Sequence, residues 1–301
     1  MPPSSGARRL ALAGETMGTS WSLVAWAPGD VSEAQIGHAL HGVFARAIAE
    51  TSLWEPDSWI CRFNALAAGE ALAAPSGVQR IWRTAVRIAE ASNGAFDPCL
   101  GAVSSRRGFI PAGPAQAESR PGRWREVLEI GETLIQPGGV MMDLNAIAKG
   151  DAVDRMAAAM NEVGVASFLV EIGGEFVGWG ATPEGLPWWV DIEPVRANDP
   201  LWRAAMSGWA LATSGGYRRM RDTAEGRISH IVPAREETHA PLASVSVFSA
   251  TCMEADAWAT ALYALGGEHA PRVAEKEGLL ALFQFGDRPA VCSSGLAAAM
   301  E

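Results

Sequence analysis

The order of strand-like and helix-like segments constrains the fold of this chain more than any other feature of its sequence. Apolar residues recur with helical spacing over 31–50, 78–91 and 253–265, whereas alternation and short apolar runs mark strands between them. The strands come in runs that are mixed with helices but do not alternate with them one for one. This order predicts an α+β fold, with mixed or antiparallel sheets packed against helices, rather than a doubly wound parallel sheet.

Local signals predict several boundaries. Residues 16–26 alternate well enough to form the first strand, and a strand–helix–strand unit is expected over 140–144, 148–162 and 167–172. Gly266 and Gly267 are expected to end the last long helix. About half of the 301 residues are apolar, which is enough for a large core. We therefore expect a flexible N-terminus over 1–14 and a single domain over 15–301.

Composition excludes some function classes. The formal net charge is -10 and no stripe of Lys or Arg occurs, so we expect no nucleic-acid partner. No segment approaches the roughly 20 apolar residues of a membrane span. The N-terminal residues lack both the long apolar run of a signal peptide and a lipid-anchor cysteine, so we expect a cytoplasmic protein. The cysteines fit neither a zinc site nor a disulfide framework and are expected to be buried free thiols: Cys61, Cys99, Cys252 and Cys292.

Two oxygen-bearing side chains interrupt an apolar helical stretch near the C-terminus. Asp256 and Thr260 are four residues apart and therefore share a helix face, while their neighbours are mostly Ala, Trp, Leu and Tyr. A buried carboxylate is costly unless it is paired or bound to a cation. Carboxylate and hydroxyl oxygens suit Mg²⁺ or Ca²⁺. The alternative is that Asp256 caps the helix or pairs with an arginine.

A second candidate lies where the expected strand 140–144 meets the next helix. Backbone groups at such a junction can face a ligand, and helix N-termini favour phosphate. Asp143 ends the strand, and Lys149 could add a positive charge. The alternative is a simple N-cap by Asp143 or Asn145 with a solvated lysine.

Three further positions combine polar groups with glycine or lie in a strand-like run. Glu175 follows Gly173 and Gly174, where the backbone could approach a ligand closely or merely turn. Ser214 precedes another glycine pair, which could contact phosphate or adenosine or form a turn. His230 could accept a proton from an attacking hydroxyl near neutral pH, although a lone histidine is more often structural.

The N-terminal third holds weaker signals. Met17 and Gly18 fall within the expected first strand, and Trp54 precedes a polar stretch in which no helix is expected. An aromatic ring there could cover a flat ring such as a flavin, or it could belong to a tryptophan-rich core. Phe96-Asp97-Pro98 follows an Asn-Gly turn and by itself indicates a helix start.

The order of these motifs is more specific than any one of them. From about Glu15 to Phe285, the chain resembles the FAD:protein FMN transferase family, the ApbE-like flavin transferases. The motifs that carry this resemblance are 17–19, 54–64, 94–98, 143–150, 173–175, 212–215, 229–231 and 255–260.

The resemblance implies an ApbE-like fold with an FAD site in a cleft between two subregions. It implies Mg²⁺-dependent transfer of the FMN moiety of FAD to a Ser or Thr hydroxyl of a flavoprotein, with release of AMP. Asp256 and Thr260 match the metal-binding Asp and Thr, and the carbonyl of Ala146 matches a backbone metal ligand. His230 is the candidate base. The expected FAD-binding residues are Met17, Trp54, Ala95, Phe96, Asp97, Asp143, Lys149, Glu175, Ser214 and Ile231.

This sequence departs from the family pattern at two places. The Asp that usually follows the His-Ile-Ile segment is missing after Val232, and Cys99 stands where Thr is usual. Two other functions therefore stay open, namely FAD pyrophosphatase activity that yields FMN and AMP, and flavin binding without turnover. The expected partner is an FMN-accepting flavoprotein or FMN-binding domain, and the expected state is a monomer or weak dimer.

Overall fold

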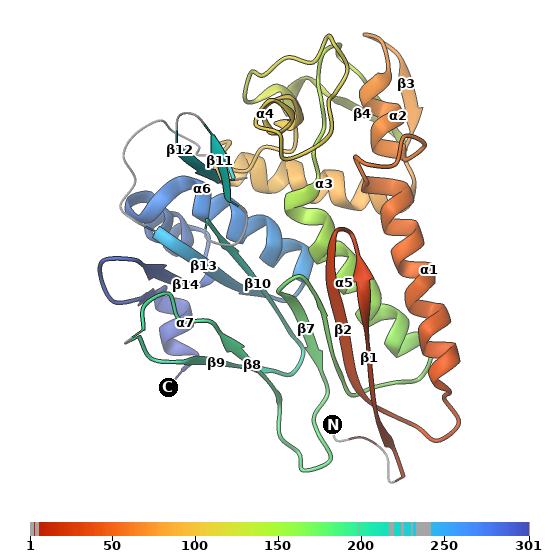
Figure 1. Ribbon diagram of the computed structural model, residues 1–301, viewed down its shortest axis with the longest axis vertical. Coiled ribbons are helices and arrows are strands. Elements are labelled where there is room, and N and C mark those ends of the chain that lie inside the picture. The colour runs from red at the N-terminus through yellow and green to blue at the C-terminus, as the bar shows by residue number, and fades with distance from the viewer. Residues whose placement is uncertain are drawn as a thin grey trace.

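The computed structural model describes residues 3, 6–197, 199–216, 220–223, 226–229, 231–232 and 242–300. Its centre is a sheet with eight strands among these residues, and every neighbouring pair is antiparallel. The α+β class expected from the order of segments is thereby confirmed (Figure 1). Across the sheet the strands are β1 (Arg8–Thr16), β2 (Thr19–Ala27), β6 (Phe168–Ile172), β7 (Glu175–Trp179), β10 (Trp209–Gly215), β13 (Leu242–Ser249), β14 (Leu280–Phe285) and β15 (Val291–Cys292).

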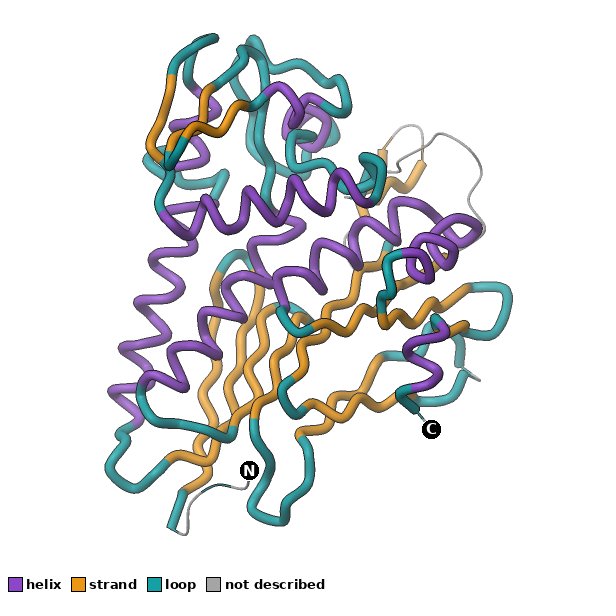
Figure 2. Tube along the Cα trace, turned by 180° about the vertical axis from the view of Figure 1, so that it is seen from behind, coloured by secondary structure: helices purple, strands orange, loops and turns teal. Residues whose placement is uncertain are grey.

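Three long helices cover one face of this sheet (Figure 2). They are α1 (Glu33–Thr51), α5 (Asn145–Glu162) and α6 (Cys252–Lys276). In β2, Trp21, Leu23 and Ala25 are buried at alternate positions and belong to one core cluster with residues of α1 and α5. The helix expected to end at Gly266 breaks there, because this glycine adopts a φ of 74°, and a second helical segment continues to Lys276.

The opposite face of the sheet is covered by a short hairpin and a short helix. The hairpin consists of β8 (Trp188–Ile192) and β9 (Trp202–Met206), and the helix is α7 (Ser294–Ala298). Val190 and Met206 of the hairpin share a buried cluster with Leu211 of β10 and Leu282 of β14. The sheet therefore has apolar contacts on both of its faces.

A separate layer sits above the ends of α1 and α5 in Figure 1. Its apolar residues join those of α6 in one core cluster, so this layer packs directly on the helix that carries Asp256. It contains α2 (Trp59–Ala65), α3 (Ser76–Ala91), α4 (Gly101–Arg106), the 3-10 helix η1 (Arg123–Glu126) and a small sheet of β3 (Ala71–Ala73), β5 (Thr133–Ile135) and β4 (Leu128–Ile130). Beside it lies the hairpin of β11 (Met220–Thr223) and β12 (Gly226–Ser229).

The beginning of the chain differs from the expectation. Residues 8–14, which we expected to be flexible, form most of β1 and pair with β2 in register. Met17 and Gly18, expected inside a strand, form the turn of this hairpin with φ angles of 50° and 72°. A two-residue hairpin turn needs such angles because they match the twist of the flanking strands.

The strand expected at 140–144 is also absent from the described residues. Met142 instead pairs with the side chain of Asn64, which donates to its carbonyl at 3.0 Å and accepts from its N–H at 2.8 Å. The only β-type pairing described for residues 140–144 is an isolated bridge between Leu100 and Met141. Only the first strand of the strand–helix–strand unit is therefore wrong, because an amide side chain replaces a neighbouring strand as the partner of this backbone. The expected helix and second strand are present as α5 and β6. No helix among the described residues combines the length and apolar character needed to cross a bilayer.

Candidate active site

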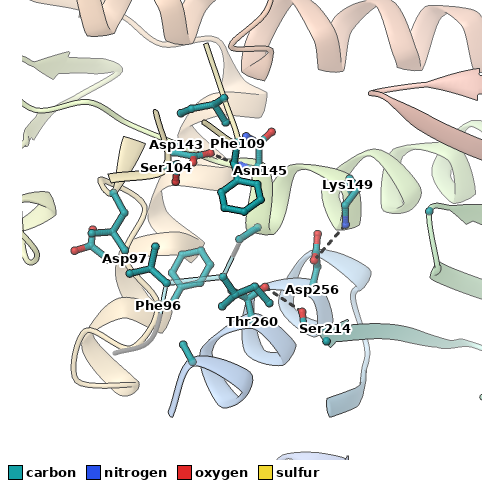
Figure 3. Close-up of a pocket in the computed structure, with 18 of the residues that line it drawn as sticks. Phe96, Asp97, Ser104, Phe109, Asp143, Asn145, Lys149, Ser214, Asp256 and Thr260 are labelled. Atoms are coloured by element: carbon teal, nitrogen blue, oxygen red, sulfur yellow. Dashed lines mark hydrogen bonds and ion pairs between the residues drawn. The ribbon is translucent and has the colours of Figure 1, made fainter. Parts of the chain in front are cut away.

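A cavity lies where the upper layer meets α5, α6 and β10, and most of the predicted site residues line it (Figure 3). Phe96 and Asp97 lie on one side of it, and Lys149, Asp256, Thr260 and Ser214 gather on the other. The predicted residues that line the cavity are Trp54, Ala95, Phe96, Asp97, Asp143, Ala146, Lys149, Glu175, Ser214, Ile231, Asp256 and Thr260.

Two predicted residues are not placed in this cavity. Met17 lies at the β1–β2 turn, is half-buried and does not line it. The motif around Met17 predicted a contact with FAD. The left-handed backbone of Met17 shows that this residue also forms the turn between β1 and β2. His230 falls outside the described residues. Its neighbours Ile231 and Val232 both line the cavity.

Asp256 and Thr260 share one face of α6, as their four-residue spacing predicts, and both face the cavity. Thr260 Oγ1 lies 3.1 Å from Ser214 Oγ on β10. Asp256 is only 3% exposed. It neither caps the helix nor pairs with an arginine among the described residues, because the cap is Thr251 and the cation nearest to its carboxylate is Lys149, with Nζ at 3.7 Å from Oδ1.

Helices α5 and α6 are joined by two sets of polar contacts. The Gly150 N–H of α5 donates to Asp256 Oδ2 at 3.0 Å. In return, Asp154 of α5 accepts hydrogen bonds from the backbone N–H groups of Cys252 and Met253, at 2.7 and 2.9 Å. These are the first N–H groups of α6, which have no partner within the helix itself. The contacts fix the first turns of both helices against each other.

Gly150 permits this close approach. A Cβ atom at this position would lie 2.3 Å from the carbonyl oxygen of Cys252. Any larger residue would therefore push the start of α6 away from α5. In a regular helix the Gly150 N–H is directed at the carbonyl of Ala146, so the hydrogen bond to Asp256 places this carboxylate beside the first turn of α5.

Lys149 and Glu175 form a buried ion pair at the same end of the cavity. Lys149 Nζ lies 2.6 Å from Glu175 Oε1. Burial raises the pKa of Glu175 to about 8, while the ammonium group of Lys149 opposes this shift and the carboxylate of Asp256 adds to it. The solvated lysine considered as an alternative is thereby excluded, since its side chain is 19% exposed and paired.

The opposite end of the cavity is apolar and aromatic. Trp54, Phe96, Phe109 and Ile110 line it, and Trp54 is 57% exposed at its rim. Flat apolar walls of this kind suit an aromatic ring system. The cavity thus offers a ring-binding end and an oxygen-rich end within one space.

Asp97 is held by backbone N–H groups rather than left free. Its Oδ1 accepts from Cys99 at 2.8 Å and its Oδ2 from Gly122 at 2.7 Å. Burial raises the pKa of Asp97, and these two hydrogen bonds limit the rise. The side chain therefore ties the segment after α3 to the loop before η1, in addition to lining the cavity.

Asp143 accepts from the Asn145 N–H at 3.1 Å, just before α5 begins. Burial raises the pKa of Asp143, and hydrogen bonds from Asn145 and Ser104 lower it. The N-cap residue of α5 is Leu144, so an N-cap at Asp143 or Asn145 is wrong. Asp143 nevertheless accepts a hydrogen bond from the first residue of the helix. Helix α5 starts three residues earlier than position 148, which places Ala146 in its first turn.

The oxygen-rich end fits a hard divalent cation. Its candidate donors are the Asp256 carboxylate and the Thr260 hydroxyl, and Ala146, whose carbonyl the family resemblance assigns to the metal, also lines the cavity. No group of three or more His, Cys, Asp or Glu side chains suited to a metal occurs among the described residues. The donor set is thus carboxylate, hydroxyl and carbonyl oxygen, which Mg²⁺ prefers, and it leaves positions for phosphate and water oxygens.

Sequence reasoning missed several residues of the cavity wall. Phe109 and Ile110 line the cavity but lie outside every motif that the sequence analysis singled out. Their apolar side chains within a Gly- and Pro-rich segment were the available signal. Leu100 and Ser104, from the short helix α4, gave no signal because they lie in no motif.

Comparison with known proteins gives consistent results. The model of the ApbE family matches residues 17–283. The chain is 30% identical over 300 residues to the FAD:protein FMN transferase of Klebsiella pneumoniae, covering 92% of this chain and 85% of the relative. It is 29% identical over 290 residues to the FAD:protein FMN transferase of Escherichia coli, covering 89% and 82%.

Solved structures agree with the sequence comparison. The fold is similar to the apo form of the flavinyl transferase ApbE from Pseudomonas stutzeri, with a TM-score of 0.87, 27% identity and coverage of 97% and 96% of the two chains. It is also similar to the flavin transferase ApbE from Vibrio cholerae, with a TM-score of 0.85, 26% identity and coverage of 97% and 99%.

Proposed function

This chain belongs to the ApbE family, and from that premise we propose that it transfers the FMN moiety of FAD to a Ser or Thr hydroxyl of a flavoprotein, with Mg²⁺ as cofactor and AMP as the released product. The observation that carries this proposal is the single cavity in which Asp256 and Thr260 face aromatic walls. An enzyme that acts on a flavin dinucleotide needs both a ring-binding surface and a cation-binding set of oxygens beside the pyrophosphate.

Different residues of the cavity are suited to bind the flavin ring and the phosphates of FAD. Trp54, Phe96 and Phe109 are suited to hold a flat ring, and Lys149 supplies positive charge at the end where phosphates would lie. Mg²⁺, when bound by Asp256, Thr260 and the Ala146 carbonyl, neutralises charge on the phosphoryl oxygens. The Gly150 N–H and Lys149 keep the Asp256 carboxylate oriented toward that place.

In the proposed reaction, the acceptor oxygen forms a bond to the phosphorus of the FMN half. The bond between that phosphorus and the oxygen that bridges to AMP breaks, and AMP leaves with the bridging oxygen. The acceptor hydroxyl loses its proton. We assign this proton to His230 because its sequence neighbours Ile231 and Val232 line the cavity.

An assay that measures three products distinguishes transfer from the two alternative functions. The protein is incubated with FAD and Mg²⁺, with and without an FMN-accepting flavoprotein domain, and AMP, free FMN and protein-bound flavin are measured. Transfer predicts AMP and protein-bound flavin in equal amounts, and only with the acceptor present. Free FMN without acceptor would favour the pyrophosphatase, and no AMP under any condition would leave flavin binding alone.

We also propose a cytoplasmic location and a monomeric or weakly dimeric state. The location is supported by the cysteines, since Cys61, Cys99, Cys252 and Cys292 are all free thiols. Cell fractionation tests the location, and sedimentation of the purified protein over a range of concentrations tests the state.

A further inference from the structure

A second cavity adjoins the candidate active site on the other side of the β6–β7 turn. Its walls come from the start of β2, from the β6–β7 turn, from β8 and from β10. Gly173 and Thr213 line both cavities, so the two spaces meet at these residues.

The junction lies at the oxygen-rich end of the active site. Thr213 immediately precedes Ser214, which is hydrogen-bonded to Thr260, and Gly173 lies two residues before Glu175. The aromatic residues Trp54 and Phe96 line only the first cavity. A group that comes from the second cavity therefore arrives where the pyrophosphate would lie, not where the flavin ring would lie.

One buried atom at this junction has no partner within the described part of the chain. Glu175 is 4% exposed, and its Oε1 is paired with Lys149, but its Oε2 accepts no hydrogen bond there. This Oε2 lies 3.4 Å from the position that a Cβ on Gly173 would take. A buried polar atom without a partner is unfavourable. A hydroxyl that comes with a substrate could donate to it.

The outer wall of the second cavity presents the edge of a strand. The last three residues of β8, 190–192, line it together with Glu193, which follows the strand. The carbonyl of Glu193 accepts from Gln284 Nε2 at 3.1 Å, so the open edge is that of residues 190–192. Successive side chains of a strand point to opposite faces, so a wall made of consecutive residues is formed by the strand edge. Among the described residues β8 pairs only with β9, which leaves this edge without a partner strand.

Charge indicates what kind of chain would occupy the space. The carboxylates of Glu171, Asp191 and Glu193 line it. Arg203 of β9 pairs with Asp191 at 2.6 Å, so the net negative charge of this wall comes from the two glutamates. Glu171 is fixed by hydrogen bonds from Ser22 and from the Gly174 N–H, so its charge stays at the base of the cavity. Such a wall favours an extended segment with N–H donors and a Lys or Arg side chain over an acidic one.

We propose that the acceptor protein enters through this second cavity as an extended segment along β8. Glu175 Oε2 accepts a hydrogen bond from its Ser or Thr hydroxyl and so positions it before that proton passes to His230. The inference rests on the proposed function, because it concerns the second substrate of that reaction. Gly173 is required at the junction, since a Cβ there would lie 2.9 Å from Thr19 Cγ2 and its φ is 60°.

The first test fills the second cavity without touching the FAD site. Ser20 is exposed and lines only the second cavity, so Ser20→Trp is the blocking variant. Ala205→Trp, at an exposed position of β9, is the matched control. The acceptor is a recombinant FMN-accepting domain that the Vibrio cholerae relative modifies, with that relative as positive control. FAD binding is followed by flavin fluorescence and transfer by protein-bound flavin.

We expect Ser20→Trp to raise the KM for the acceptor by at least about tenfold, as the loss of an interface contact does, with an unchanged Kd for FAD. Ala205→Trp should behave as the wild type. Transfer by Ser20→Trp at the wild-type KM overturns the inference alone. A wild-type protein that forms no bound flavin on an acceptor that the relative modifies overturns the proposed function, and the inference with it.

The second test addresses Glu175 directly. Glu175→Gln keeps the size of the side chain but places an N–H₂ group on one of its two terminal positions. We expect transfer at saturating FAD to slow by about tenfold or more, because the variant disturbs the acceptor hydroxyl. The Kd for FAD is measured alongside, since Glu175 also pairs with Lys149 at the proposed phosphate end. A loss of FAD affinity that accounts for the whole loss of transfer would assign Glu175 to FAD and overturn its role toward the acceptor.

Discussion

The backbone N–H of Gly150 donates a hydrogen bond to Asp256 Oδ2 at 3.0 Å, across a separation of 106 residues in the sequence. This contact joins the second turn of α5, one turn after Ala146, to the face of α6 that contains Thr260. The relative position of the two helices therefore determines whether the proposed metal ligands face one another.

Replacing Asp256 tests the metal assignment. Asp256→Asn keeps the shape of the side chain but removes its charge, so we expect Mg²⁺-dependent AMP release to fall by about 100-fold or more. Asp30→Asn removes an exposed carboxylate before α1 and is the control. Steady-state assays over a range of Mg²⁺ concentrations measure the effect, and equal activity of the two variants would refute the assignment.

Replacing Gly150 tests the close approach of α5 and α6. The Cβ of Gly150→Ala would lie 2.3 Å from the Cys252 carbonyl oxygen, so we expect a loss of about 1–3 kcal/mol in the free energy of unfolding and a weaker response to Mg²⁺. Gly37→Ala on α1 is the matched control, because its new Cβ meets nothing within 4 Å. That control should stabilise the protein by up to about 1 kcal/mol. Urea unfolding of both variants measures the effect, and a Gly150→Ala variant as stable as Gly37→Ala would contradict the close approach of the two helices.

The Asp154 carboxylate predicts a pH dependence of stability. Burial raises its pKa from 3.8 to about 6, against hydrogen bonds from Met253 and Cys252 and the nearby charge of Arg80, while Asp151 adds to the rise. A raised pKa means that the native state takes up the proton first. The associated stability is fully present below pH 3.8 and is lost as the pH rises through about 6.

The Asp154→Asn variant has no titratable group at this position. The difference in stability between the wild type and this variant therefore reports the titration of Asp154 alone. Between pH 7.5 and pH 4.5, the wild type should gain about 2 kcal/mol of stability relative to the variant, because each pH unit below a pKa of about 6 contributes about 1.4 kcal/mol. Urea unfolding of both proteins at several pH values measures the gap. A gap that stays constant over this range would contradict the prediction.

Mg²⁺ binding should depend on FAD. The protein supplies only part of an octahedron through Asp256, Thr260 and Ala146, and phosphate oxygens would fill further positions. We expect Mg²⁺ to bind at least about tenfold more tightly with FAD than without it. Calorimetric titration under both conditions measures this, and Asp256→Asn should abolish the difference. Equal Mg²⁺ affinity in both states would mean that the protein alone completes the site.

The sequence by itself determined the α+β class and most of the long elements. Helical spacing placed α1 and α3 within a few residues of their observed bounds, and alternation and short apolar runs placed β2 and β6. It also placed Asp256 and Thr260 on one face of a buried helix. These properties depend on residues close together in the chain, so periodicity alone can report them.

The contacts that build the candidate site were decided only by the tertiary structure. The Lys149–Glu175 pair, the Gly150–Asp256 hydrogen bond and the Asp154 contacts with α6 join residues 26 to 106 positions apart, and no periodicity encodes which segments meet. For the same reason the strand expected at 140–144 failed, since the partner of Met142 is the side chain of Asn64, 78 residues away. Local sequence determines how a segment can fold, but the neighbour that satisfies its polar groups is selected when the whole core packs.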